Sequence, residues 1–120
     1  MAEILVDTDV LIDHLRGKRR LIRRKDRISY SVVTRAQLFA GHSTDEARVG
    51  ELLAPFREVA IDRAIAERAG RIRRRSGTPL ADALIAATAI ERGLMLATRN
   101  VSDFAGIRGL KLRPPVDPSP

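Results

Sequence analysis

The sequence contains no cysteine and no tryptophan, and only two of its 120 residues are histidine. Without cysteine the chain has neither disulfides nor thiolate-bound metal, and His14 and His42 are too few for a histidine-based zinc cage. Any metal site is therefore expected to use carboxylate oxygens, the ligands that favour Mg²⁺ or Mn²⁺. Three phenylalanines and one tyrosine leave little capacity for stacking on nucleic-acid bases.

Long apolar runs are also missing. No segment approaches the ~20 apolar residues that span a bilayer, and the first apolar stretch is interrupted by Asp7 and Asp9. The start of the chain, Met1-Ala2-Glu3, has no basic region and no small-residue cleavage site, so no signal peptide is expected. The sequence therefore predicts a cytoplasmic protein that does not enter a membrane.

Positive charge is concentrated in one stretch of the chain. The net charge is +7, and residues 16–27 hold eight basic residues and one acid, which leaves 14 basic and 14 acidic residues elsewhere. Such a stretch is typical of a surface that faces nucleic acid, although a solvated helix face or an interface with an acidic protein is the alternative. We name these eight residues the basic segment: Arg16, Lys18, Arg19, Arg20, Arg23, Arg24, Lys25 and Arg27.

Hydrophobic patterning predicts strands that alternate with helices. Strands are expected at 3–7, 28–33, 58–61, 94–98 and, as a short fifth, 110–112. Helices are expected at 9–16, 34–40, 44–53, 64–75 and 78–92, with a further short helix around residues 21–22. The alternation indicates an α/β fold in which a central, mainly parallel sheet of four to five strands is flanked by helices. Residues 1–113 are expected to form one domain and 114–120 a proline-rich tail.

Cap residues are expected at most of these helix ends. Thr8 or Asp9 is expected to cap the first helix, and Thr34 and Asp62 are expected to cap two later ones. Thr78 followed by proline predicts a helix whose first residue is that proline. Glycines that follow the apolar periodicity, at positions 17, 41, 77 and 93, are expected to end helices.

Four acidic residues follow expected strands or begin an expected helix. Asp7 ends the first strand and Asp9 lies two residues later, whereas Asp82 lies in the first turn of helix 78–92 and Asp103 follows the fourth strand. Ligands of parallel sheets bind at the carboxyl ends of strands, so these acids are expected at one edge. Grouped carboxylates raise one another's pKa, and a divalent cation relieves that repulsion and activates water against phosphate. Taken singly, each acid is equally explained as a helix cap, a dipole complement or a turn residue.

Three segments resemble the motifs of PIN domains, in the same order along the chain. Residues 4–12 (ILVDTDVLI) resemble the opening of these domains, 80–89 (LADALIAATA) their D-x-x-I-A-A helix, and 96–104 (LATRNVSDF) their T-x-N-x-x-D-F segment. The group that the chain resembles most is the VapC toxins of type II toxin–antitoxin pairs. This resemblance implies a PIN-like three-layer fold and a Mg²⁺- or Mn²⁺-dependent endoribonuclease that is usually a homodimer. It also implies a cognate antitoxin that holds the enzyme inactive, with a segment across the active-site groove.

The same resemblance assigns roles to individual residues. It implies that Asp7, Asp82 and Asp103 hold the metal and act in the hydrolysis of RNA. Three more residues, Asp9, Thr98 and Asn100, are expected to support these ligands from the rim of the site. The basic segment is then expected to bind the RNA backbone without reading its sequence.

Position 37 departs from the family pattern. Residues 31–41 (SVVTRAQLFAG) resemble the PIN segment S-x-x-T-x-x-E-L-x-x-G, but Gln37 stands where glutamate is expected. Glutamine has nearly the same shape without the charge, and its carbonyl oxygen can bind a metal whereas its NH₂ cannot. Two interpretations follow: a catalytic Gln37 site with weakened metal binding and activity, or a catalytically silent PIN-fold module that binds RNA or protein.

A third interpretation comes from the first motif alone. Residues 7–11 (DTDVL) also resemble the D-x-D-x-[TV] nucleophile loop of haloacid-dehalogenase phosphotransferases. Those enzymes need a later lysine and a downstream acidic pair. The chain has three lysines, of which two lie in the basic segment, and only Asp117 follows Lys111. This interpretation is therefore the weakest of the three.

Overall fold

The computed structural model describes residues 3–17 and 27–114. In these ranges the strands are β1 (Glu3–Val6), β2 (Arg27–Ser31), β3 (Arg57–Val59), β4 (Met95–Ala97) and β5 (Leu112–Arg113). The helices are α1 (Thr8–Leu15), α2 (Val32–Phe39), α3 (Glu46–Leu53), α4 (Arg63–Ser76), α5 (Leu80–Arg92) and α6 (Val101–Phe104). The short helix expected around residues 21–22 and the tail from residue 115 lie outside the described residues. No helix in the described ranges is long and apolar enough to span a bilayer.

All five strands form one parallel sheet in the order β3-β2-β1-β4-β5. The chain builds one half of the sheet outward from β1 through β2 to β3, then returns to the other side of β1 with β4 and β5. The strand order therefore reverses between β1 and β4, and in open α/β sheets this reversal opens a crevice at the carboxyl ends. The expected α/β fold with a mainly parallel sheet is confirmed, and the fifth strand begins at Leu112 instead of residue 110.

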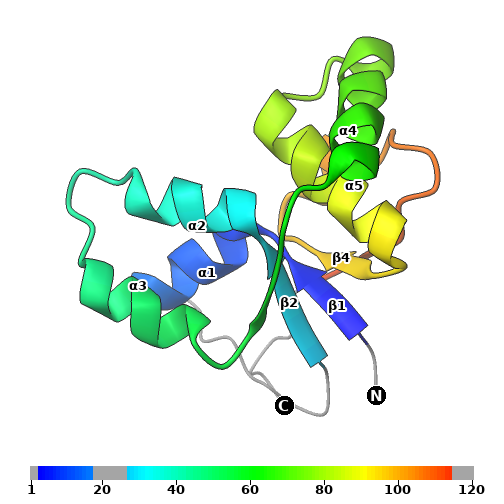
Figure 1. Ribbon diagram of the computed structural model, residues 1–120. Coiled ribbons are helices and arrows are strands. Elements are labelled where there is room, and N and C mark those ends of the chain that lie inside the picture. The colour runs from blue at the N-terminus through cyan, green and yellow to red at the C-terminus, as the bar shows by residue number, and fades with distance from the viewer. Residues whose placement is uncertain (1–2, 18–26, 115–120) are drawn as a thin grey trace.

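The central strand β1 is buried on both faces, which explains its uninterrupted apolar sequence. Ile4 and Val6 pack into one core with α1, α2 and α3, whereas Leu5 points into the other core with α4, α5 and α6. Figure 1 shows α1, α2 and α3 gathered on one side of the sheet and α4 and α5 on the other. The molecule thus has three layers. β1 is the central strand of the middle layer, so its carboxyl end lies between the two helical layers.

Several helix starts differ from the sequence prediction. α3 begins at Glu46, after the cap Asp45, instead of at residue 44. Asp7 caps α1, instead of Thr8 or Asp9, and its carboxylate accepts from the backbone N–H of Thr8. Ser31 caps α2 instead of Thr34, because its hydroxyl lies at the end of β2 and reaches the N–H of Val33 at 3.1 Å. α5 begins at Leu80, since Pro79 keeps an extended ψ of 144° and so stands before the helix.

Other predicted helix ends are confirmed, and one short helix was not predicted. Asp62 caps α4, and the left-handed Gly77 and Gly93 end α4 and α5, conformations that glycine adopts without strain. The sequence predicts a loop after the fourth strand, but the structure forms α6 there, and this helix buries Phe104 in the core beside α5. Burial of one phenylalanine thus fixes the segment that carries Asp103.

Candidate active site

The carboxyl ends of β1 and β4 are tied together at Asp7 and Thr98. The backbone N–H of Asp7 donates to the carbonyl of Ala97 at 2.9 Å, which extends the pairing of the two strands by one residue. The hydroxyl of Thr98 then donates to Asp7 Oδ2 at 2.8 Å. The parallel register thus brings together two residues that are 91 positions apart in the chain.

Asp7 is a buried carboxylate with an unusual affinity for protons. Its Oδ1 accepts from the N–H of Thr8 at 2.8 Å, and the side chain is 4% exposed. The pKa of Asp7 is raised to about 7, mainly by burial and also by the charges of Asp9 and Asp82, while the hydrogen bonds from Thr98 and Thr8 oppose the rise. A cation at this carboxylate would favour its charged form.

Asp9 presents an unused acceptor beside Asp7. Its Oδ2 accepts from the side-chain amide of Asn100 at 2.9 Å, and the N–H of Asn100 donates to the hydroxyl of Thr98 at 3.0 Å. The other oxygen, Asp9 Oδ1, is buried without a hydrogen-bond partner in the described part of the chain. Burial raises the pKa of Asp9, while the nearby Arg99, which pairs with Asp13, lowers it. A buried carboxylate oxygen without a donor is a position that suits a cation.

Asp82 and Asp103 complete the acidic edge from the other side of the sheet. Asp82 is half-buried in the first turn of α5, and its pKa is raised by burial and then by the charges of Asp103 and Asp9. Asp103 lies on the exposed side of α6. Electrostatic repulsion therefore links Asp7 with Asp9 and Asp82, and Asp82 with Asp103. Over residues 3–17 and 27–114, however, no three acidic or histidine side chains lie close enough to enclose one ion.

Gln37 lies at the same edge within a neutral hydrogen-bonded group. The hydroxyl of Thr8 donates to Gln37 Oε1 at 2.5 Å and lies 2.9 Å from the hydroxyl of Thr34. Because Thr8 has a single hydroxyl proton, Thr34 is the donor in the second contact. We call Thr8, Thr34 and Gln37 the neutral corner. The sequence does not predict the two threonines as site residues, although Thr34 is the threonine of the matched S-x-x-T segment.

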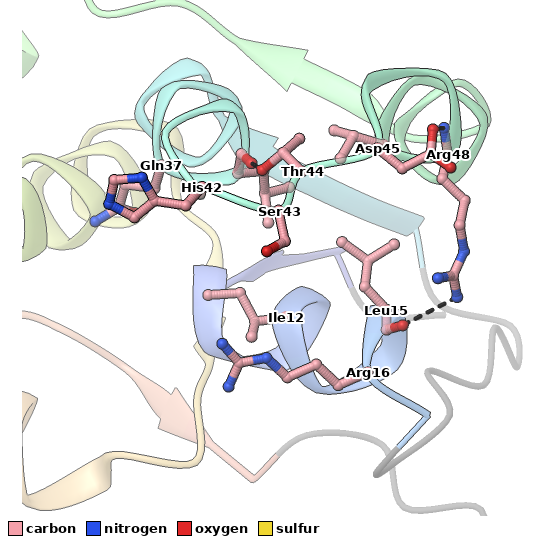
Figure 2. A pocket seen from close by; sticks show the side chains of 12 residues that line it. Ile12, Leu15, Arg16, Gln37, His42, Ser43, Thr44, Asp45 and Arg48 are labelled. Carbon is pink, nitrogen blue, oxygen red and sulfur yellow. Dashed lines mark hydrogen bonds between the residues drawn. The ribbon is translucent and has the colours of Figure 1, made fainter.

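The neutral corner opens into a pocket of about 400 Å³ between α1 and the segment that joins α2 to α3 (Figure 2). Apolar side chains of Ile12 and Leu15 form one wall, and Gln37 and His42 lie at one end. Arg48 closes the other end, where its guanidinium donates to the carbonyl of Leu15 at 2.9 Å. The pocket is thus partly apolar and reaches the acidic edge through Gln37.

Most of the basic segment lies outside the described residues, namely Lys18, Arg19, Arg20, Arg23, Arg24 and Lys25. Of the two described members, Arg16 follows the end of α1 and lines the pocket, and Arg27 begins β2 and pairs with Glu3 at 3.7 Å. Because β2 runs parallel to β1, Arg27 lies at the edge of the sheet opposite to Asp7. Its role in RNA binding stays a prediction.

Known proteins with this fold and these motifs identify the family. The PIN domain family model matches residues 4–109. The chain is 44% identical to Ribonuclease VapC10 of Mycobacterium tuberculosis over 90% of both chains. Among solved structures, a toxin–antitoxin complex from Klebsiella pneumoniae has a chain with 34% identity and a TM-score of 0.73, covering 95% of this chain and 98% of that one. A DNA-bound VapBC structure from Salmonella typhimurium has 25% identity and a TM-score of 0.79, with coverage of 95% and 98%. The chain therefore belongs to the PIN domain family.

Proposed function

We propose that this protein is a ribonuclease toxin of the VapC kind, which hydrolyses RNA with Mg²⁺ or Mn²⁺ held by Asp7, Asp82 and Asp103. The observation that carries this proposal is the acidic edge itself, where burial and mutual repulsion raise the pKa of Asp7 and Asp82. The relative VapC10, at 44% identity, is named a ribonuclease. The family match also favours this function over phosphotransfer by the haloacid-dehalogenase mechanism.

The residues present fit a hard divalent cation. Asp7, Asp9, Asp82 and Asp103 bring carboxylate oxygens to the edge, and Asp9 Oδ1 is a buried oxygen without a donor in the described residues. A bound ion would supply a water of lowered pKa and stabilise negative charge on the scissile phosphate. Thr98 and the N–H of Thr8 hold the two oxygens of Asp7 in place, so this ligand needs no reorganisation. Asp82 then approaches from α5 and Asp103 from α6.

Gln37 reduces the activity in this proposal but does not abolish it. Its Oε1 accepts from Thr8, directly beside Asp7, so the side chain occupies the place of the expected glutamate without adding charge. Asp7, Asp82 and Asp103 are all present, whereas Asn100 stands at a position where related PIN domains can carry an acid. The site therefore keeps its carboxylate set and lacks one negative ligand, which favours a weakened nuclease over a silent binding module.

We also propose a cognate antitoxin as partner and a homodimer as the working form. The relatives include chains from toxin–antitoxin and VapBC complexes. Uncompensated carboxylates attract an arginine from such a partner, and the partly apolar pocket beside Gln37 offers room for an adjoining segment. Copurification with the product of a neighbouring small gene, followed by light scattering, tests both points. A toxic chain that is always found without a protein partner would contradict the first.

The nuclease proposal is tested by cleavage of single-stranded RNA with Mg²⁺ or Mn²⁺, with EDTA as the metal-free control. Asp82→Asn should lower the rate at least about 100-fold, because it removes a metal ligand and its charge. The matched control is Glu51→Gln, which neutralises an exposed acid of α3 and should leave the rate unchanged. Cleavage that is unaffected by EDTA or by Asp82→Asn would refute the assignment.

A further inference from the structure

A second cluster of positive charge lies at the C-terminal end of α4 and beside it. Arg74 and Arg75 lie three and four residues after Arg71, so each of them is a neighbour of Arg71 on the surface of the helix. Arg108 joins them from the connection between α6 and β5. All four are exposed, and within residues 3–17 and 27–114 none of them has a hydrogen bond or an ion pair. We call these four residues the arginine rim.

Two members of the rim, Arg75 and Arg108, line a hollow of about 370 Å³. Ile72, Arg75 and Ser76 form its α4 side, and residues 106–108 form the other. Figure 1 shows this connection, in orange, passing beside α4. The neighbouring Arg73 is used differently, because its guanidinium donates to the carbonyls of Gly77 at 2.7 Å and Thr78 at 3.3 Å and so fixes the turn into α5. Arg73 therefore stabilises the turn, whereas the rim arginines have no such hydrogen bond in the described residues.

Helix electrostatics explain only part of this arrangement. Positive residues in the last turn of α4 complement the helix dipole, which accounts for Arg74 and Arg75. Arg108 belongs to another element and has no helix end to complement. No acidic residue occurs at positions 68–81 or 104–116, so the sequence around the hollow supplies no counter-charge. Arg75 and Arg108 line the same hollow from two elements without an ion pair in the described residues, which indicates an anionic partner.

The rim also adjoins the acidic edge along the chain. Asp82 lies in the first turn of α5, six residues after Ser76, and Asp103 lies in α6, five residues before Arg108. Both walls of the hollow therefore lead directly to a proposed metal ligand. A polyanion whose scissile phosphate sits at the acids would pass next to these arginines.

We propose that the arginine rim binds the sugar–phosphate backbone of single-stranded RNA beside the cleavage site, an inference that rests on the proposed ribonuclease function. The planar guanidinium groups of Arg75 and Arg108 face one hollow from two sides and match the bidentate geometry of phosphate oxygens. The contacts are to the backbone and carry no sequence preference. They lie on the sheet half formed by β4 and β5, apart from the basic segment that the sequence analysis singles out.

The test is the salt dependence of RNA binding, measured by fluorescence anisotropy with an unstructured single-stranded RNA in EDTA, so that no cleavage occurs. Arg75→Gln/Arg108→Gln should flatten the slope of log K against log salt by about 1.4, or 0.7 for each phosphate contact of a single strand. The same loss corresponds to binding about 25-fold weaker at 0.1 M salt. Melting temperatures of all variants show that the fold is kept.

The matched control is Arg57→Gln/Arg63→Gln, which removes the same charge from two exposed arginines that have no ion pair within the described ranges. This control should change the slope much less. Equal slopes for the two double variants would overturn the proposal. So would a rim variant that binds RNA normally but loses a copurifying protein, because the rim would then serve an acidic protein.

The outcomes also separate this inference from the proposed function. If the chain never cleaves RNA but the rim variant loses RNA binding, the rim assignment stands and the nuclease assignment fails. If the chain cleaves RNA and both double variants bind it equally, the rim assignment fails alone.

Discussion

The edge that carries the site divides into two hydrogen-bonded groups of opposite character. In the neutral corner, the hydroxyl of Thr8 donates to Gln37 and accepts from Thr34, and none of the three side chains is charged. In the acidic group, the carboxylates of Asp7 and Asp9 lie beside each other, their pKa values are raised, and Asp9 Oδ1 has no donor among the described residues. One part of the edge is therefore satisfied by hydrogen bonds within the fold, whereas the other keeps a buried acceptor that the proposed cation would occupy.

Removing the charge of Asp7 should relieve the repulsion in the acidic group and give the largest effect on the free energy of unfolding. Asp7 has a pKa of about 7 in the folded chain and about 3.8 when exposed. Between these values the folded state binds the proton that the unfolded state has released, so stability falls as the pH rises through 7. Asp7→Asn cannot ionise, and without divalent metal it should raise the free energy of unfolding at pH 8 by about 2 kcal/mol.

Urea unfolding at pH 5 and pH 8 checks this expectation. The wild-type chain should lose stability between the two pH values, and Asp7→Asn should lose much less. Glu51→Gln, at an exposed position of α3, serves as the control and should behave like the wild type. An equal pH dependence in the wild type and Asp7→Asn would show that Asp7 carries no unfavourable charge.

Adding a negative charge to the neutral corner should raise metal affinity and RNA cleavage. Gln37→Glu keeps an acceptor for the hydroxyl of Thr8 and adds a negative ligand next to Asp7. We expect Mn²⁺ to bind about 10-fold tighter and RNA cleavage to rise by a similar factor, which corresponds to about 1.4 kcal/mol. Calorimetry and a cleavage assay measure the two quantities.

The matched control for this change is Ala36→Glu, which adds the same charge at an exposed position of the same helix. It should alter neither quantity. If Gln37→Glu gains nothing over Ala36→Glu, position 37 lies outside the metal site and the silent-module interpretation becomes the better one.

Thr98→Val should give the smallest effect, about 1 kcal/mol. It removes the hydroxyl that donates to Asp7 Oδ2 and accepts from the N–H of Asn100. Since this hydrogen bond lowers the pKa of Asp7, its loss should raise that pKa and so extend to higher pH the range over which stability falls. Thr88→Val is the control, because that buried hydroxyl donates to Leu84 inside α5. The same shift in both variants would remove Thr98 from its positioning role.

Much of the fold could be predicted from the sequence, because alternating strand and helix patterns lead to a parallel sheet. The convergence of Asp7, Asp82 and Asp103 on one edge follows from the same rule. The start of α2 could not be predicted well, since Ser31 and Thr34 are both good caps and the end of β2 decides between them. α6 is too short for a periodic signal and depends on a tertiary contact of Phe104.

The details of the site needed the structure for a different reason. The pairs Thr8–Gln37 and Asp9–Asn100 join residues 29 and 91 positions apart, and their side-chain directions leave no mark in the local pattern. The arginine rim is hidden for a similar reason. Outside residues 16–27 the acidic and basic residues balance in number, but the fold brings Arg75 and Arg108 from two different elements to one hollow.

The proposed function requires a divalent metal at the acidic edge, and calorimetric titration with Mn²⁺ measures that binding without RNA. The wild-type chain, Asp7→Asn and the control Glu51→Gln should be titrated under the same conditions. We expect Mn²⁺ to bind the wild type and Glu51→Gln equally tightly. Asp7→Asn should bind it at least about 10-fold more weakly, because a deprotonated ligand is lost. Equal affinity for all three proteins would contradict it.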